Sequence, residues 1–346
     1  MTTSDGTRLE EPGTAAPAVT PSTPGVPYHT VMTAPPGTWS VPAAVPVAGL
    51  PAPSKVLSAA AVAAGPMLFL GVVAAGTGNP ACSAVRTNWQ QTPSWTSFDS
   101  TGQSGVVNAR VAAVGGSPVM LTVREADLSL WWATWTQSTG KWSTFENLEG
   151  ESGTNTQIGA VLSPAAAAVG GDLHVCAVNS AGRLYHSIHF GANEDYPAGT
   201  WQPFLEINSN MHVPLANVVD VAAASDGSQL HVVALTAGGT VWRAVRQTSG
   251  GSWSEWASAP SVNGVGTAYR VSATVLLGSL YVGVVTDHGH AYVGAYDLRT
   301  SQWSGSPSGT WRDLATLTGA SVGQVSDATL AADGMYLHVA FVANGG

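Results

Sequence analysis

Short apolar runs joined by tight turns recur along most of the chain. Two examples are "VVDVAAASDGSQLHVVALTAGG" and "YRVSATVLLGSLYVGVVTDHG", each with a pair of strand-length runs around a polar or glycine turn. Runs of this length, rich in Val, Thr and aromatic residues, favour strands. A sustained apolar stripe with the helical period of about 3.6 residues is absent. The pattern predicts an all-β protein built from hairpins.

The apolar runs group in fours, and the group repeats. The second run reads LHVCAV, LHVVAL, LYVGVV and LHVAFV at residues 173, 230, 280 and 337, and the third reads LWWATW, LYHSIH, VWRAVR and AYVGAY. A period of about fifty residues with four strands in each unit is typical of a β-propeller blade. The fourth run is marked by a tryptophan, namely Trp95, Trp142, Trp201, Trp253 and Trp311.

Each end of the chain carries half of a further unit. Tyr28 and His29 stand where Tyr185 and His186 stand in a complete unit, and the C-terminal stretch contains only the first two runs. We therefore predict a six-bladed β-propeller over residues 25–346, with four antiparallel strands per blade and the ring closed by pairing of the N- and C-terminal strands. The expected blades are 54–100, 105–150, 157–208, 214–260, 265–317, and 318–346 together with 25–48.

Two segments outside this pattern have simple interpretations. Residues 1–24 are rich in Pro and Thr and poor in large apolar residues, so a disordered tail is expected, with a tether to a protein partner as one use for it. The run from Val56 to Gly76 is apolar enough for a membrane helix. Because Gly65 and Pro66 divide it into two strand-length halves, we expect a strand pair and no membrane span.

Composition and charge exclude several classes of function. Charged residues make up 10% of the chain and its formal net charge is -9, so a basic face for nucleic acid is not expected. Cys82 and Cys176 have no metal-site spacing and are expected to be free thiols inside the fold. The N-terminus lacks the pattern of a signal peptide, which favours a cytoplasmic location or release by a non-classical route to act outside the cell.

Motifs for catalysis and metal binding are also missing. The sequence has no nucleophile elbow, zinc-protease motif or phosphate loop, and "TSGGSWSEW" and "SPSGTW" do not match the Asp-box of sialidases. The pairs His186/His189 and His288/His290 lack a third ligand. We expect a protein that is not an enzyme and binds neither a metal nor a cofactor.

The third and fourth runs carry the candidate binding residues. On the third strand, the leading residue and the residue four places later face one side, while the residue one place later faces the other. The leading aromatic is expected to pack against a neighbouring blade, whereas the other two positions vary in polarity as a cleft lining does. Aromatic faces beside planar polar groups suit sugars. The candidates are Trp131, Trp132, Trp135, His186, His189, Arg243, Arg246, Tyr292 and Tyr296 of the third runs, with Trp142, Trp201, Trp253 and Trp311 of the fourth.

The repeat resembles the six-bladed, fucose-binding propeller lectins of bacteria and fungi. The resemblance covers about 320 residues and rests on the aromatic-led third run ("VWRAVRQTSGGSWSEWASA", "LYHSIHFGANEDYPAGTWQPF"), the fourth-run tryptophan and the terminal closure. It implies multivalent binding of monosaccharides between adjacent blades, where an Arg and a Glu hold fucose beside a Trp. Here Arg124 is the one arginine on an expected second strand, and no repeated Arg/Glu pair follows.

Three functional hypotheses follow. The leading one is a lectin-like propeller with several weak sites for glycans or glycoconjugates in its inter-blade clefts, made useful by avidity. The alternative is a structural or receptor-binding adhesion component of a phage-like or injection apparatus, with residues 1–24 as its tether. A divergent propeller glycosidase is the third.

Terminal closure makes a direct prediction about stability. A shortened chain that begins at Lys55 lacks the two runs that the N-terminal stretch contributes to the sixth blade. We expect it to lose cooperative unfolding, because nothing then pairs across the seam of the ring. Urea denaturation followed by circular dichroism compares the two chains, and identical unfolding curves would show that terminal closure is wrong.

Overall fold

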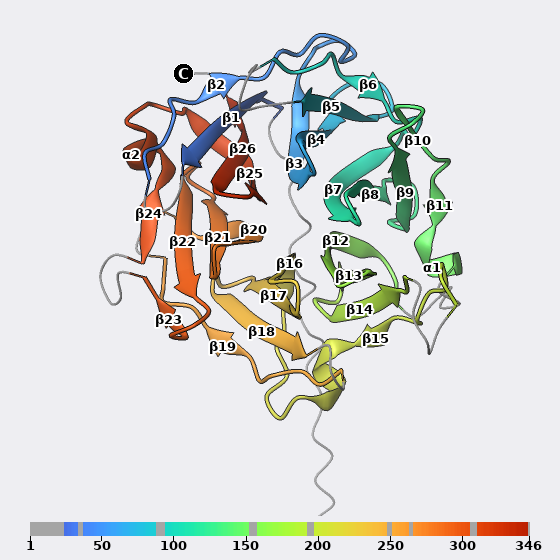
Figure 1. Ribbon diagram of the computed structural model, residues 1–346, viewed down its shortest axis with the longest axis vertical. Helices are drawn as coiled ribbons and strands as arrows, with labels where there is room; N and C mark the ends of the chain where they lie inside the picture. Colours follow the sequence, from blue (N-terminus) through green and yellow to red (C-terminus); the bar gives the residue numbers. More distant parts are fainter. Residues whose placement is uncertain are drawn as a thin grey trace, which may run out of the picture.

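Six antiparallel sheets surround a central axis in the computed structural model (Figure 1). Each sheet runs from an inner strand to a short outer strand, which confirms the all-β, six-bladed propeller. The tail expected at residues 1–24 lies outside the described residues except for its last position. The structure describes residues 24–33, 37–87, 94–151, 158–191, 197–247, 251–262, 266–304 and 310–344.

The blades are named A to F in chain order. Blade A contains β3 (Val56–Ala64), β4 (Met67–Ala74), β5 (Ala81–Thr87) and β6 (Asp99–Ser100). Blade B contains β7 (Val106–Val114), β8 (Ser117–Arg124), β9 (Leu130–Thr136), β10 (Lys141–Trp142) and β11 (Glu146–Asn147), followed by the helix α1 (Leu148–Glu151). Blade C contains β12 (Val161–Val169), β13 (Asp172–Asn179), β14 (Leu184–His189) and β15 (Leu205–Glu206), followed by the 3-10 turn η1 (Ile207–Asn210).

The second half of the ring repeats this order. Blade D contains β16 (Val218–Ser225), β17 (Gln229–Thr236), β18 (Val241–Gln247) and β19 (Ala257–Ser258). Blade E contains β20 (Ala268–Leu276), β21 (Ser279–Thr286), β22 (Ala291–Asp297), β23 (Gln302–Trp303) and β24 (Trp311–Asp313), followed by the helix α2 (Leu314–Thr318). Blade F contains β25 (Gln324–Asp333), β26 (Tyr336–Asn344), β1 (Val26–Thr33) and β2 (Ala43–Ala44).

Blade F is built from both ends of the chain. Strand β1 pairs with β26 along its whole length, from Val26 opposite Ala343 to Thr33 opposite Tyr336. Figure 1 shows the blue β1 beside the red β26. The ring of Tyr28 also stacks on Phe341 with centroids 5.4 Å apart. The predicted closure of the ring by the two termini is therefore confirmed.

The apolar run at 56–76 forms the hairpin of β3 and β4, as predicted. Strand β4 is buried along almost its whole length, which explains its hydropathy without a membrane. Among the described residues, no helix is long and apolar enough to cross a membrane.

The inner strands are rich in alanine because the blades converge at the axis. Strands β3, β7, β12, β16, β20 and β25 surround a narrow channel with a volume of about 240 Å³. Its walls include Ala61, Ala112, Ala167 and Ala224. Larger side chains would hold neighbouring inner strands apart, so the taper of the ring selects small residues here.

A ring of polar residues surrounds the axis at a bulge that all six inner strands share. A bulge places an extra residue in one strand and redirects the side chain that follows it. All of the residues that follow the bulge are buried and polar: Ser58, Asn108, Ser163, Asp220, Arg270 and Asp327. We call this set the axial ring.

Hydrogen bonds from the axial ring join neighbouring blades. Asp220 accepts a hydrogen bond from the backbone N–H of Val271 in the next blade at 2.8 Å and another from the hydroxyl of Ser163 in the preceding blade. Asp327 accepts in the same way from Ala59 N at 3.1 Å. Each carboxylate therefore satisfies a buried backbone donor of the adjacent inner strand.

Arg110 adds a charge interaction across the ring. Its guanidinium lies 3.8 Å from Asp220 and 3.9 Å from Asp327. Burial raises the pKa of Asp327, and the charges of Arg110 and Arg270 oppose that rise. The four charged groups compensate one another inside the fold, so removal of one leaves a buried charge without its partner.

The axial ring predicts a large effect for one substitution. In Asp220→Ala, the N–H of Val271 loses its acceptor and the charge of Arg110 is less compensated, so we expect the free energy of unfolding to fall by about 3–5 kcal/mol. Urea denaturation measures this change. Asp99 is exposed, and the control Asp99→Asn should change stability by less than about 0.5 kcal/mol. A loss of under about 1 kcal/mol for Asp220→Ala would mean that the ring does not hold the blades together.

Candidate functional site

The third strands of adjacent blades meet across each inter-blade cleft. Positions on a third strand are counted from the residue equivalent to Tyr185 of blade C, which is called the leading residue. The leading residue and the residue four places later face the preceding blade. The residue one place after the leading residue faces the following blade. In blade C, Tyr185 and the neighbouring Trp201 pack against Trp132 of blade B, whereas His186 turns toward Trp253 of blade D. This arrangement follows from strand alternation.

Four equivalent positions therefore line each cleft. The first blade supplies the residue one place after its leading residue and a nearby second-strand residue, which are His186 and His174 in the cleft between C and D. The next blade supplies the residue four places after its own leading residue and the fourth-strand tryptophan, which are Arg246 and Trp253 in that cleft. We call these the cleft positions.

Two clefts have histidine pairs at the positions of the first blade. In the cleft between C and D, His174 Nδ1 and His186 Nε2 share a hydrogen bond of 2.9 Å, and the His186 ring meets Trp253 edge to face at 5.3 Å. Arg246 of blade D completes the set, and its charge adds to burial in lowering the pKa of both histidines.

The cleft between F and A repeats this constellation. His29 Nε2 lies 3.1 Å from His338 Nδ1, and Arg86 Nη1 lies 3.1 Å from His29 Nδ1. Since a guanidinium can only donate, His29 Nδ1 accepts from Arg86 and His29 Nε2–H donates to His338. His29 is therefore neutral in the native state. Trp95 meets the His29 ring edge to face at 5.6 Å.

Aromatic rings occupy the clefts on either side of blade B. In the cleft between B and C, Trp132 lies 5.0 Å from His189 and 5.1 Å from Trp201 between ring centroids. In the cleft between A and B, Trp142 Nε1 donates to Ser83 at 2.9 Å, and Trp135 meets Phe69 at 5.4 Å.

Arg243 joins blades D and E. Its guanidinium donates to the hydroxyl of Tyr296 at 2.9 Å and lies 4.2 Å from the centroid of that ring. Arg243 Nη1 also lies 3.4 Å from His231 Nδ1. In these five clefts, residues at the cleft positions contact one another directly.

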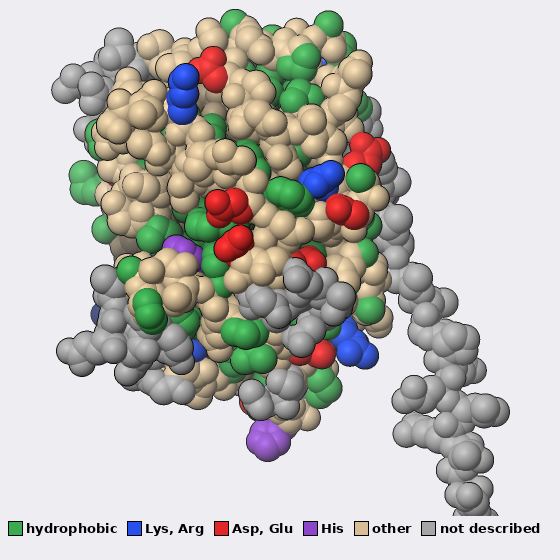
Figure 2. Space-filling model, turned by 90° about the vertical axis from the view of Figure 1, so that its right-hand side faces the viewer, with side chains coloured by type: hydrophobic (Ala, Val, Ile, Leu, Met, Phe, Trp, Pro, Cys, Tyr) green, Lys and Arg blue, Asp and Glu red, His purple; other side chains and the backbone are tan. Residues whose placement is uncertain are grey.

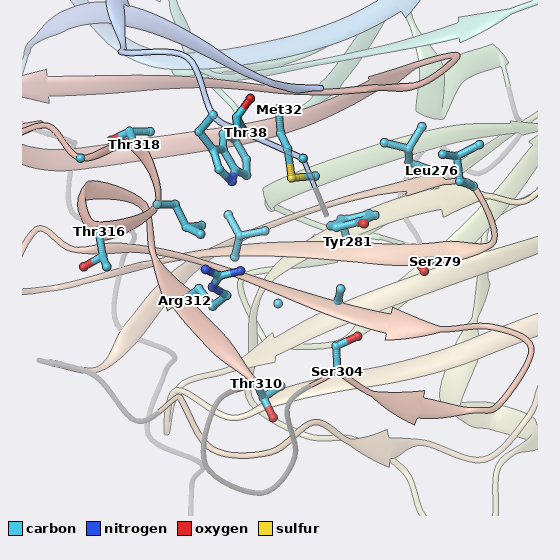
Figure 3. A pocket seen from close by; sticks show the side chains of 18 residues that line it. Met32, Thr38, Leu276, Ser279, Tyr281, Ser304, Thr310, Arg312, Thr316 and Thr318 are labelled. Carbon is cyan, nitrogen blue, oxygen red and sulfur yellow. The ribbon is translucent and has the colours of Figure 1, made fainter. Parts of the chain in front are cut away.

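The cleft between E and F differs at two of its four positions, where Val293 and Met32 replace the polar or aromatic residues of the other clefts. The cleft positions hold Val293, Tyr281, Met32 and Trp39, and they line a cavity of about 950 Å³. Figure 3 shows Met32, Tyr281 and Arg312 around this cavity. We call it the seam pocket, since one wall comes from the N-terminal part of blade F.

The wall of the seam pocket from blade E combines small residues with polar groups. Ala295 of β22 lines the pocket, and Arg312 of β24 lies opposite Val293 in the strand register. Thr310 also lines the pocket, and its hydroxyl is buried with no hydrogen-bond partner in the described residues. A buried hydroxyl without a partner is costly unless a ligand or water supplies one.

The thirteen sequence candidates lie in other clefts and in the blade cores, and none of them lines the seam pocket. Sequence reasoning selected large aromatic and charged residues, whereas this cavity forms where the equivalent positions hold Val293 and Met32. Trp39, Tyr281 and Arg312 were missed. Alignment of Tyr28 and His29 with the repeat was the signal that could have placed Trp39 beside blade E.

Trp311 needs a correction. The tryptophan equivalent to Trp142, Trp201 and Trp253 in blade E is Trp303, which pairs with Tyr296 as Trp142 pairs with Trp135. Trp311 instead pairs with Gly294, and its Nε1 donates to the carbonyl of Pro260 at 2.9 Å. Blade E has two tryptophans after its third strand, and only the backbone register distinguishes them.

The other candidates have structural partners. Trp131 donates to the hydroxyl of Ser129 at 2.7 Å and stacks under Arg124 at 4.8 Å, and Tyr292 is buried in the core between blades D and E. His186 and His189 face different clefts, as alternation requires. Among the described residues, no group of three His, Cys, Asp or Glu side chains is suited to hold a metal.

Both cysteines are free and buried, as predicted. Burial raises the pKa of the Cys82 thiol to about 11 and that of Cys176 to about 12. Thiols with pKa values this high stay protonated near neutral pH and react slowly.

Comparison with known proteins places the chain in a fold rather than in a sequence family. No known protein-family model matches the sequence, and no curated protein matches it. The SapL1 lectin, solved in complex with alpha methyl fucoside, has a TM-score of 0.53 at 15% identity, over 80% of this chain and 84% of that chain. The BP39L lectin from Burkholderia pseudomallei has a TM-score of 0.54 at 16% identity, over 77% and 73%.

A sialidase shares the architecture as well. The Hadza microbial sialidase Hz136 has a TM-score of 0.56 at 14% identity, over 83% of this chain and 65% of that chain, so this chain spans less than two thirds of it. The expected resemblance to propeller lectins is confirmed at the level of the fold. Identities this low show the shared propeller alone, and the binding chemistry must be argued from the clefts.

The histidine pairs predict acid sensitivity. Burial lowers the pKa of His174 and His338 to about 4 and that of His29 well below its usual range. In the unfolded chain these side chains have a pKa of about 6.5. Below that pH the unfolded state binds more protons, so stability falls as pH drops from about 6.5 toward 4, by up to about 3 kcal/mol for one such histidine.

A double variant tests this assignment. His29→Ser with His338→Phe copies Ser83 and Phe69, which occupy the equivalent positions between blades A and B. Urea denaturation between pH 7 and pH 4.5 should give a shallower loss of stability than in the wild type. The control His288→Gln removes a histidine whose side chain is 61% exposed, and a change of slope there as large as that of the double variant would contradict the assignment to the buried pair. An unaltered slope in the double variant would refute the role of this pair.

Proposed function

We propose that the protein binds carbohydrate in clefts between adjacent blades, with the seam pocket as its principal site and without catalysing a reaction. The observation that carries this proposal is the lining of the pocket. Trp39 and Tyr281 supply aromatic surface, and Ser279, Thr310 and Arg312 supply polar groups. Aromatic surface with a few convergent polar groups is the combination that sugar rings require.

The dimensions of the pocket fit this use. A volume of about 950 Å³ is at the upper end of the usual range for small-molecule sites, which leaves room for a mono- or disaccharide.

The similar structures support the proposal at the level of the scaffold. Two of them carry the word lectin in their names, and one was solved with a fucoside. A sialidase has the same architecture, so the fold alone does not separate binding from hydrolysis.

The lining of the pocket favours binding over hydrolysis. Glycosidases need two carboxyl groups beside the scissile bond, commonly about 5–10 Å apart. The residues that line the seam pocket in the described part of the chain include neither Asp nor Glu. A sugar held there would meet no carboxyl group from these lining residues, so the pair of carboxylates that most glycosidases use is not present among them.

The cleft between B and C is the best candidate for a second site. Trp132 Nε1 is buried with no partner among the described residues, and it lies beside His189 and Trp201. A ligand acceptor there would satisfy this donor. Several weak sites around one ring would raise avidity on a glycan-coated surface.

Substitution of the aromatic wall tests the principal site. We expect Trp39→Ala to weaken binding to the best sugar found on a glycan array by about tenfold, because the sugar loses its stacking surface at a cost near 1.4 kcal/mol. Calorimetric titration of the full chain with that sugar measures the change.

Trp253→Ala is the matched control for this prediction. Trp253 occupies the equivalent position in the cleft between C and D, so its loss should leave affinity at the seam pocket within about twofold. No binding to any sugar on the array would contradict the proposed function. An unchanged affinity in Trp39→Ala would contradict the assignment of the principal site.

A further inference from the structure

The seam pocket contains a positively charged side chain, and no acidic residue is among the described residues that line it. Figure 3 shows the Arg312 side chain reaching toward the middle of the cavity. It is the only charged residue among the described residues that line the pocket. No salt bridge of Arg312 is found in the described part of the chain either.

The nearest acidic residue in the sequence is already engaged elsewhere. Asp313 lies next to Arg312 on β24, and its carboxylate lies 3.2 Å from His290 Nδ1. Its other oxygen accepts from Thr316 N at 3.1 Å and caps the helix α2. Strand alternation sends adjacent side chains to opposite faces, so Asp313 points away from the pocket side of Arg312.

In the described part of the chain, Arg110 and Arg183 are the lysines or arginines for which a salt bridge is found, and Arg312 differs from the others without one in that it lines the seam pocket. The chain has 12 Lys and Arg against 21 Asp and Glu, and Figure 2 shows charged side chains scattered thinly over one side of the ring. Arg183, another exposed arginine, lies 3.7 Å from Glu206. Arg312 is exposed, and a guanidinium on the wall of an open pocket with no acidic lining residue creates a local positive potential that salt can screen.

We infer that the ligand of the seam pocket is an acidic sugar, whose anionic group pairs with Arg312. This inference rests on the proposed function and specifies the charge of the ligand. A guanidinium offers parallel N–H donors that match the two oxygens of a carboxylate, and such charge-assisted pairs are stronger than neutral hydrogen bonds. The sugar ring then lies toward Trp39 and Tyr281, which line the same pocket.

Paired sugars that differ only in charge test the inference. Methyl glucuronide against methyl glucoside, and methyl galacturonide against methyl galactoside, isolate the carboxylate, while galactose 6-sulfate against galactose presents a sulfate. Calorimetric titration of the full chain should show about tenfold tighter binding of at least one acidic sugar than of its neutral parent. This preference should shrink near 1 M salt, where the Debye length is about 3 Å.

Arg312→Gln separates the charge from the rest of the pocket. It should abolish the preference for the acidic sugar and leave the affinity for the neutral parent within about threefold, and Arg312→Lys should restore part of the preference. Arg299→Gln changes an exposed arginine of the same blade outside the pocket and should have no effect. Thermal unfolding of each variant confirms that the fold is retained.

The outcomes distinguish the two levels of the proposal. Preference for an acidic sugar that Arg312→Gln removes supports the inference. Binding of neutral sugars equally well or better, or a preference that survives Arg312→Gln, overturns the inference and leaves carbohydrate binding intact. Absence of binding to charged and neutral sugars alike overturns the proposed function itself.

Discussion

The ladder between β1 and β26 is the constraint on which the rest of the structure depends. A propeller made from one open chain has a seam that no covalent bond crosses, and sheet edges left there would be exposed. In this protein eight residue pairs, from Val26 with Ala343 to Thr33 with Tyr336, cross that seam as antiparallel partners. The stacked rings of Tyr28 and Phe341 reinforce the ladder. With blade F complete, every blade has neighbours on both sides, and every inter-blade cleft has two walls.

The same closure creates the strongest candidate site. Met32 and Trp39 belong to the N-terminal half of blade F, whereas Tyr281, Thr310 and Arg312 belong to blade E. The seam pocket therefore exists only when the first strand of the chain is paired with the last. A ligand that contacts both walls would bind the closed ring and not the open one, so binding and closure would stabilise each other.

The repeat supplies one scaffold whose clefts differ in chemistry. Equivalent positions hold Trp132, His186 and Arg243 in three blades and Val293 in a fourth, while the backbone register around them is conserved. Aromatic rings meet edge to face across some clefts, as His186 meets Trp253 and Trp132 meets Trp201, and stabilise the interfaces between blades. Where Val293 and Met32 stand, the cleft contains the seam pocket. Toward the axis, polar contacts are required, because Asp220 and Asp327 satisfy buried backbone donors of the neighbouring inner strands.

The repeat of apolar runs was enough to predict six blades, four strands in each and the union of the two chain ends, because strand period and turn spacing are local properties of the sequence. It also predicted which faces of the third strand Trp132 and Tyr185 would occupy.

The axial ring was not predicted, because a bulge is defined by pairing with a partner strand and leaves no fixed local pattern around Ser163 or Asp220. Likewise, only the register of β22 with β23 shows that Trp303, and not Trp311, matches the other fourth-strand tryptophans. The seam pocket was also decided by tertiary structure alone. Its volume depends on how side chains from residues about 260 positions apart in the sequence fill a shared space. Whether a carboxylate lies beside Arg312 likewise depends on which strands pack around it, and not on the sequence next to it.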